Sequence, residues 1–485
     1  MNNYTEKQAR IPILEALIAY RQHVKVLGHV PGHKGGQGLY GDFAHYAMQL
    51  AMIDATELPG LDDLFHPQGA IAEAQALAAE AFGSLSTYFL VAGSTAGNLA
   101  AILATCDEGD LALVVRHAHQ SVWHGLDLAR ARRATIQPAI DCFGVLTSPS
   151  VESVKEAFLR YPLAKVLIVT SPTYDGRIGD LRALIEVAHA HDALVIVDEA
   201  HGVHLPFHPQ IPQSAIALGA DLIVQSAHKM GTGLTQTGLL HVGTNRVSQV
   251  KLQKALRMVQ SSSPSYLLLA SIDAMRAQLA LEGEARIGKA LVAMQKEQQR
   301  LFDACPSILA YERDGARQDP FKWLIDATPF GFSGFALEQR LREQYGIYAE
   351  YATQRHVLFV FSYGTRPKEW TIVTDALLEL HALAKDSVMG DLPKDDHDLD
   401  PVSPMYDALP FHKDRSRWVL LSMAIGSTCA QTVTIYPPGI PILLPGEVIY
   451  ASHIEILRRV LDNKKRVDGL MDGDEGYAIH CFINE

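Results

Sequence analysis

Short apolar runs alternate with amphipathic stretches between about residues 70 and 240 of this 485-residue chain. In the amphipathic stretch 181–190, the apolar residues Leu184, Ile185, Val187 and Ala188 recur at roughly helical spacing. Because strands that alternate with helices are typical of βαβ units, the pattern predicts an α/β, doubly wound domain with a mainly parallel sheet. The apolar runs that predict its strands are residues 88–91, 111–115, 166–169, 194–197 and 222–224.

The pattern changes after residue 260. A cluster of serines around one proline at 261–265 precedes a stretch with few helix breakers, which predicts a helix at 267–302 that links two domains. A later strand is predicted at 357–361, and the polar segment 394–398 is typical of a linker. The predicted parts are an N-terminal arm at 1–60, a large domain at 61–300, a small α/β domain at 301–390 and a C-terminal subdomain at 391–485.

Composition narrows the class of protein. Hydrophobic residues make up 48% of the chain and charged residues 20%, which is a globular balance. The net charge of -12 comes without a basic run, which argues against nucleic acid or an anionic membrane as partner. The five cysteines form no CxxC pair, and the N-terminus lacks the layout of a secretory signal. We therefore expect a reducing, cytoplasmic location with no membrane span.

Polar residues follow each predicted strand. Ligands of open parallel sheets bind beyond the carboxyl ends of the strands, so these residues predict one shared crevice. The segments are Gly-Ser-Thr-Ala-Gly-Asn at 93–98, Arg-His-Ala-His at 116–119, Ser-Pro-Thr-Tyr-Asp-Gly at 171–176, Asp-Glu-Ala-His at 198–201 and Ser-Ala-His-Lys at 226–229.

The segment 93–98 opens a predicted helix whose first N–H groups suit a phosphate, with Ser94 and Thr95 as further donors. Taken by itself, the segment is more typical of a capped helix start than of a phosphate site. The segment is not a P-loop, because the GK[ST] ending is absent.

Asp198 ends a very apolar strand, so its carboxylate needs a cationic or N–H partner, for which a pyridinium N–H is suited. A structural salt bridge, a helix cap, or a metal bound with Glu199 and His201 are the alternatives. Consecutive residues of a strand point to opposite faces, which argues against a metal shared by Asp198 and Glu199. We predict no metal site.

Lys229 follows another buried strand, where desolvation favours the free amine that a Schiff base requires. A lone lysine at a strand end is more often a solvated cation, so this interpretation depends on Ser226, on His228 and on the other strand ends. The imidazole of His119 is suited to stack on a flat aromatic ligand, although a lone histidine is more often structural.

Ordered motifs along nearly the whole chain make the sequence similar to a known family. It resembles the bacterial ornithine, lysine and arginine decarboxylases, pyridoxal 5′-phosphate (PLP) enzymes of fold type I. The matching segments are residues 31–36, 57–64, 93–95, 116–119, 173–176, 198–201, 226–229, 234–236, 263–266 and 436–441.

The resemblance implies a PLP-binding large domain followed by smaller α+β domains, and it implies roles for the strand-end residues. Lys229 would hold PLP as a Schiff base, Asp198 would pair with the pyridine nitrogen and His119 would stack on the ring. His201 would lie against the cofactor, and Thr173 near the ring hydroxyl. The implied phosphate ligands are Ser94, Thr95, Ser226 and His228.

The resemblance also implies the reaction, decarboxylation of a basic L-amino acid to an amine and CO2. About thirty residues precede Pro31, so the chain resembles the short, biosynthetic arginine decarboxylases of polyamine biosynthesis. We rank arginine first, lysine second and ornithine third. Gln431 stands where we expect Glu, which bears on the choice of substrate. A homodimer or tetramer is implied, with the active site at the dimer interface and the loop 261–265 near the neighbouring subunit's phosphate.

One other class of enzyme stays open on the residues, and a non-enzymatic class is disfavoured. The strand ends suit an aminotransferase or a PLP lyase equally well, with Arg342 or Arg355 available for a substrate carboxylate. A PLP-sensing regulator would carry a helix-turn-helix domain ahead of this fold, for which the few residues before Pro31 leave no room. An inactive scaffold would be expected to have lost Lys229 or Asp198, and both are present.

Overall fold

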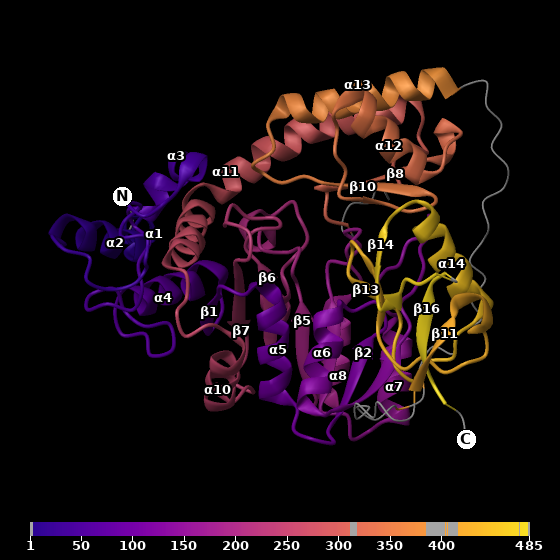
Figure 1. Cartoon of the computed structure of the whole chain (residues 1–485), viewed down its shortest axis with the longest axis horizontal. Coiled ribbons are helices and arrows are strands. Elements are labelled where there is room, and N and C mark those ends of the chain that lie inside the picture. Colours follow the sequence, from indigo (N-terminus) through magenta and orange to yellow (C-terminus); the bar gives the residue numbers. More distant parts are fainter. Residues whose placement is uncertain are drawn as a thin grey trace. The chain divides into compact units, whose positions relative to one another are not determined.

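The computed structural model describes residues 3–310, 318–384, 403, 405, 416–474 and 476–483 (Figure 1). The predicted linker at 394–398 lies outside the described residues. The chain divides into two compact units. Unit 1 comprises Met1–Thr105, Leu181–Met294 and Phe361–Arg366, and unit 2 comprises Cys106–Asp180, Gln295–Val360 and Pro367–Glu485. The four-part division at residues 60, 300 and 390 stays a prediction.

Unit 1 begins with the helices α1 (Asn3–Gln8), α2 (Pro12–His23), α3 (Gly41–Ala51) and α4 (Ala70–Phe82). Proline at the first position of α2 suits a helix start, because that position needs no amide donor. The buried side chains of α4 include Ile71, Leu77 and Phe82, and α4 packs against α2 and β1.

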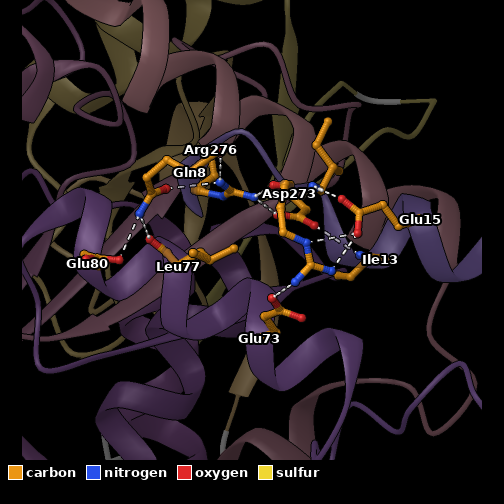
Figure 2. Close-up of polar contacts among 10 residues, drawn as sticks. Gln8, Ile13, Glu15, Glu73, Leu77, Glu80, Asp273 and Arg276 are labelled. Carbon is orange, nitrogen blue, oxygen red and sulfur yellow. Dashed lines mark hydrogen bonds and ion pairs between the residues drawn. The ribbon is translucent and has the colours of Figure 1, made fainter. Parts of the chain in front are cut away.

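The junction of α1 and α2 is held by a buried ion pair on α11 (Tyr266–Ala304), as Figure 2 shows. Arg276 pairs with Asp273 of the same helix, and both side chains are 0% exposed. The guanidinium also donates to the backbone carbonyls of Gln8 and Arg10, each at 2.6 Å, and the amide of Ile13 donates to Asp273 at 3.2 Å. Burial of this pair ties the N-terminal helices to the body of unit 1.

Four strands of unit 1 run in the order β1 (Ser86–Leu90), β7 (Gly238–Val242), β6 (Leu222–Ser226) and β5 (Leu194–Asp198). β5 and β6 are parallel, so their carboxyl ends lie side by side, with Asp198 opposite Val224. β7 is antiparallel to both β6 and β1. Its short apolar run, interrupted by His241, was not predicted as a strand, and it adds two antiparallel pairings to a sheet that is otherwise mainly parallel, as expected.

The helix α5 (Gly93–Thr105) covers this sheet, and Figure 1 shows it alongside β6. Gly97 allows the close approach, because a Cβ there would lie 2.6 Å from Val224 Cγ1 and 2.8 Å from Leu90 Cδ1. The other helices of unit 1 are α8 (Leu181–Ala190), η1 (Leu205–Phe207), α9 (Ala215–Leu218), α10 (Gln249–Val259) and the first part of α11. The long helix predicted at 267–302 is thus confirmed.

Unit 2 contains the parallel strands β4 (Val166–Thr170), β2 (Leu111–Val115) and β3 (Arg132–Ile136), in that order, with helices α6 (Gln120–Ala129) and α7 (Val151–Arg160). β3 was not predicted because it begins with two arginines. Arg133 is nevertheless 2% exposed and pairs with Asp127 at 2.7 Å.

Three further antiparallel sheets complete unit 2. The first, in the order β8 (Lys322–Asp326), β10 (His356–Val360) and β9 (Tyr351–Ala352), accompanies η2 (Thr328–Phe330), α12 (Gly334–Tyr345) and α13 (Pro367–Ala384). The second is β11 (Ser416–Leu420), β16 (Ala478–Phe482) and β15 (Leu470–Met471), and the third is β13 (Ile440–Leu443), β12 (Val433–Tyr436) and β14 (Arg466–Asp468). With η4 (Leu421–Met423) and α14 (Ala451–Asp462) they enclose a core that includes Leu443, Leu457 and Ile479. In the described part of the chain, no helix has the length and apolarity needed to cross a membrane.

Candidate active site

Asp198 is the last residue of β5 and is 3% exposed. Its Oδ2 accepts a hydrogen bond from Asn98 Nδ2 of α5 at 2.9 Å, and its Oδ1 accepts one from the Ala200 amide at 3.2 Å. Two donors therefore fix a buried carboxylate at the carboxyl end of the sheet. Asn98 was not singled out in the sequence, although an amide among alanines and leucines on a buried helix face signals a polar contact.

Glu199 points away from Asp198, as the alternation of side chains along an extended chain predicts. Its carboxylate accepts hydrogen bonds from Ser214 Oγ at 2.7 Å, the Ala215 amide at 2.7 Å and Gln225 Nε2 at 2.6 Å. Burial raises the pKa of Glu199 to about 7, although these three donors oppose the rise.

A buried chain of hydrogen bonds continues from Gln225. Its Oε1 lies 3.0 Å from His241 Nε2, and His241 Nδ1 lies 2.8 Å from Thr87 Oγ1. Burial lowers the pKa of His241 to about 3, so the imidazole is neutral. Since Gln225 donates to Glu199, its oxygen accepts from Nε2–H, and Nδ1 then accepts from Thr87. These hydrogen bonds connect buried side chains of β1, β7, β6 and the end of β5.

Replacement of Glu199 by glutamine is expected to flatten the dependence of stability on pH. The pKa of Glu199 in the folded state, about 7, lies above the usual value of 4.5. The contribution of this carboxyl group to the stability of the fold is therefore complete below pH 4.5 and is lost as the pH rises toward 7. Melting temperatures measured from pH 4.5 to 7.5 should therefore fall more in the wild type than in Glu199→Gln. Glu284→Gln, at an exposed position of α11, is the matched control. Equal slopes in all three proteins would contradict the prediction.

Lys229 lies in the loop after β6, beside the loop after β5 that carries His201. Its Nζ is 3.2 Å from His201 Nε2. The parallel pairing of β5 and β6 brings these two loops together. An imidazole at this distance can take a proton from the ammonium group, which leaves a nucleophilic amine.

Hydroxyl and imidazole groups gather at the start of α5. Ser226 Oγ donates to Ser94 Oγ at 2.8 Å, and Thr95 follows on the same first turn with an exposed side chain. His228 Nδ1 donates to the Thr237 carbonyl at 2.9 Å, which leaves Nε2 as the outer nitrogen of that ring. The first-turn amides of a helix have no intrahelical acceptor, so this end of α5 suits an anion.

His119 and Thr173 belong to unit 2. His119 is the N-cap of α6, and its Nδ1 accepts from the Ser121 amide at 3.2 Å, so the proton of the neutral ring is on Nε2. Thr173 follows β4, is 2% exposed, and accepts through Oγ1 from the Arg177 amide at 3.0 Å. Of the nine predicted site residues, the other seven lie in unit 1, around the ends of β5 and β6 and the start of α5.

The groups of unit 1 fit the chemistry of PLP. An amine beside an imidazole suits the aldehyde carbon, a buried hydrogen-bonded carboxylate suits the pyridine N–H, and hydroxyls at a helix start suit the phosphate. They come from three predicted strand ends, at residues 93–98, 198–201 and 226–229. The fold and this donor set define a fold type I PLP-dependent enzyme.

Comparison with known proteins identifies the family. The family model for the Orn/Lys/Arg decarboxylase major domain matches residues 11–314, and that for the C-terminal domain matches residues 402–478. The chain is 34% identical over 482 residues to an arginine decarboxylase of Bacillus anthracis, covering 97% of each chain. It is 35% identical over 473 residues to an arginine decarboxylase of Halalkalibacterium halodurans, covering 93% of this chain and 94% of the relative. The chain therefore belongs to the Orn/Lys/Arg decarboxylase family and is a PLP-dependent decarboxylase.

Solved structures agree with this fold. The lysine decarboxylase of Francisella novicida superposes with a TM-score of 0.80 at 18% identity, covering 97% of this chain and 81% of that one. The constitutive lysine decarboxylase of Escherichia coli gives a TM-score of 0.77 at 19% identity, covering 98% and 82%. The predicted fold class and the predicted resemblance are both confirmed.

Proposed function

We propose that this decarboxylase converts L-arginine to agmatine and CO2, with lysine as the second candidate and ornithine as the third. The observation that carries the proposal is the identity of about 34% with arginine decarboxylases over nearly the full length of both chains. A lysine decarboxylase of Pseudomonas aeruginosa and an inducible ornithine decarboxylase of Escherichia coli are 26% and 27% identical, over 58% and 56% of this chain. The arginine relatives are thus more similar than these two and are matched over more of the chain. The constitutive lysine decarboxylase of Escherichia coli matches 93% of this chain, but at 23% identity.

We assign the residues of unit 1 to the three parts of the cofactor. Lys229 would hold the aldehyde carbon, and Asp198 would accept the pyridine N–H while Asn98 and the Ala200 amide keep its carboxylate in place. His201 would take up the proton that Lys229 must lose. The phosphate would be held by Ser94, Thr95, Ser226 and His228.

As the family resemblance implies, the flat imidazole of His119 would stack on the cofactor ring, and Thr173 would lie near the ring hydroxyl. When bound, PLP accepts the electron pair released as the bond between Cα and the carboxylate breaks. The reaction consumes one proton, which is delivered to Cα, so L-arginine and H⁺ give agmatine and CO2.

An aminotransferase would need a free arginine for the substrate carboxylate. Both candidate arginines are already ion-paired: Arg342 with Glu338 one helical turn away, and Arg355 with Asp326 at 2.7 Å. Gln431 likewise has a partner, because its Nε2 donates to the Gly469 carbonyl. The two ion pairs support decarboxylation over amino transfer.

The proposal is tested by measuring CO2 release from L-arginine, L-lysine and L-ornithine by the PLP-loaded protein. We expect the highest kcat/KM with arginine. Borohydride reduction followed by peptide mapping should place the phosphopyridoxyl group on Lys229. CO2 release from lysine alone would identify the protein as a lysine decarboxylase, the second candidate. No CO2 release from any of the three amino acids would refute the proposal. Detection of pyridoxamine phosphate during turnover would favour amino transfer.

We further propose that the protein forms a homodimer or tetramer in the cytoplasm. The active site would lie at the dimer interface, with the loop 261–265 near the phosphate bound by the neighbouring subunit. Large apolar side chains on α3 support an assembly: Phe43 is 67% exposed and Tyr46 83%. Light scattering should show more than one chain per particle. An active monomer would contradict the proposal.

A further inference from the structure

The loop that carries His119 is in contact with a turn from the C-terminal part of unit 2, residues 436–441. The Gln120 amide donates to the Gly439 carbonyl at 3.0 Å. Gly439 has a φ of +84°, and a Cβ at this position would lie 2.8 Å from His119 Nε2. Such a contact is tighter than carbon and nitrogen atoms tolerate, so the absence of a side chain lets the turn lie against the edge of the imidazole.

Arg116, three residues before His119, holds the strand that follows this turn. Its Nε and Nη2 each lie 2.8 Å from a different carboxylate oxygen of Glu447. Nη1 donates to the Pro441 carbonyl at 2.8 Å, and Nη2 also donates to the Ile442 carbonyl at 3.1 Å. The Arg116 and Glu447 side chains are 15% and 23% exposed, so the ion pair is partly shielded from water.

Glu447 is in turn fixed by the chain around it. Its Oε2 accepts from the Leu444 amide at 2.8 Å, in the segment directly after β13. One guanidinium therefore joins the loop after β2 to both ends of the segment 441–447. Because these bonds are planar, bidentate and partly buried, a lysine at position 116 would reproduce the charge but not the geometry.

We propose that Arg116 and Glu447 are positioning residues that set the orientation of the His119 ring. The inference rests on the proposed function, in which His119 stacks on the cofactor. One edge of the ring is held by the Ser121 amide at Nδ1, and the other edge lies against Gly439. With both edges held, the face of the imidazole has one orientation. Loss of the ion pair releases the turn, and the ring then loses its contact at Nε2.

The test compares Arg116→Gln with Arg300→Gln, a control in the same unit that removes ion pairs to Glu297 and Asp375, each at 2.6 Å. Three quantities are measured: hydrogen exchange of the Gln120 amide in cofactor-free protein, the dissociation constant of PLP from its absorbance, and kcat. Arg116→Gln should speed the exchange at Gln120, weaken PLP binding and lower kcat roughly 10- to 100-fold, the usual size of a small misplacement. Arg300→Gln should change none of the three by more than about twofold.

A double-mutant cycle with His119→Ala separates positioning from general stability. If Arg116 acts through His119, Arg116→Gln should change PLP affinity by less than about twofold when His119 is already absent. The inference would be overturned if Arg116→Gln weakened PLP binding equally with and without His119. Unchanged hydrogen exchange of the Gln120 amide in Arg116→Gln would also overturn it. Should Arg116→Gln fail to fold, Arg116→Lys and Gly439→Ala carry the same test with the charge retained. A wild-type protein that binds PLP but releases no CO2 would refute the proposed function, whereas exchange and PLP affinity would still decide this inference.

Discussion

Replacement of Lys229 by alanine is expected to lower kcat by roughly 10⁴-fold or more. One positioned proton-transferring side chain contributes a factor of about 10²–10⁴ to the rate, and the covalent attachment of PLP proposed for Lys229 would be lost in addition. Lys229 is in the loop directly after β6, and its amine lies 3.2 Å from His201 Nε2. Alanine leaves the carboxylate of Asp198 and the hydroxyls of Ser94 and Ser226 in place. The variant should therefore still bind PLP, but without a covalent bond.

Steady-state CO2 release and borohydride mapping measure these two effects separately. Lys254→Ala, which removes an exposed lysine of α10, is the matched control and should keep full activity with the label on Lys229. Small primary amines added to Lys229→Ala are expected to restore part of the rate, because they supply the missing nitrogen. A variant with wild-type kcat, or a label that persists at another lysine, would show that Lys229 does not have this role.

Replacement of Arg276 by alanine is expected to destabilise unit 1 by about 3–5 kcal/mol, the typical cost of breaking a buried ion pair. Asp273 would remain buried and without its guanidinium, and the carbonyls of Gln8 and Arg10 would lose their donor (Figure 2). Burial already raises the pKa of Asp273, and Arg276 offsets part of that rise. The loss should thus grow as the pH rises, because protonation of Asp273 at lower pH removes the unpaired charge.

The control is the double variant Arg276→Met with Asp273→Leu, which replaces both charges by apolar side chains of similar size. It should be more stable than Arg276→Ala, because no isolated charge is left in the interior. It should stay below the wild type, since the amide of Ile13 loses its acceptor at a cost of about 1–3 kcal/mol. The order of stability of the three proteins is measured by their melting temperatures and by the rate of proteolysis within α1 and α2. A double variant less stable than the single one would contradict the account.

The ends of the predicted strands show what local sequence determines. Asp198, Ser226 and Lys229 follow runs of buried apolar residues, and the strands of α/β units lie side by side with the same direction. The run itself specifies a strand, the polar residue after it specifies the end of that strand, and parallel pairing then brings successive ends together. This reasoning needs no knowledge of distant contacts, so the grouping around β5, β6 and α5 was predictable.

Other elements depended on contacts that no local pattern records. β7 is a short apolar run with a histidine inside it, and it is a strand because His241 finds partners in Gln225 and Thr87. β3 begins with two arginines, and it is stable there because Arg133 pairs with Asp127. In both cases a tertiary partner satisfies a polar group whose burial would otherwise be unfavourable, and it is this partner that decides the structure.

The sequence by itself thus determined the fold class, the cofactor and the residues at each strand end, because these follow from hydrophobic periodicity and from motifs within a few residues. Only the tertiary structure decided how those residues are held: Asn98 against Asp198, and the turn at Gly439, which Arg116 holds through Pro441, against His119. These partners are distant in the chain, and their pairing depends on the distances and burial of individual side chains. Hydrogen bonds and ion pairs act over a few ångströms, so the side chains that meet are known only once the chain has folded.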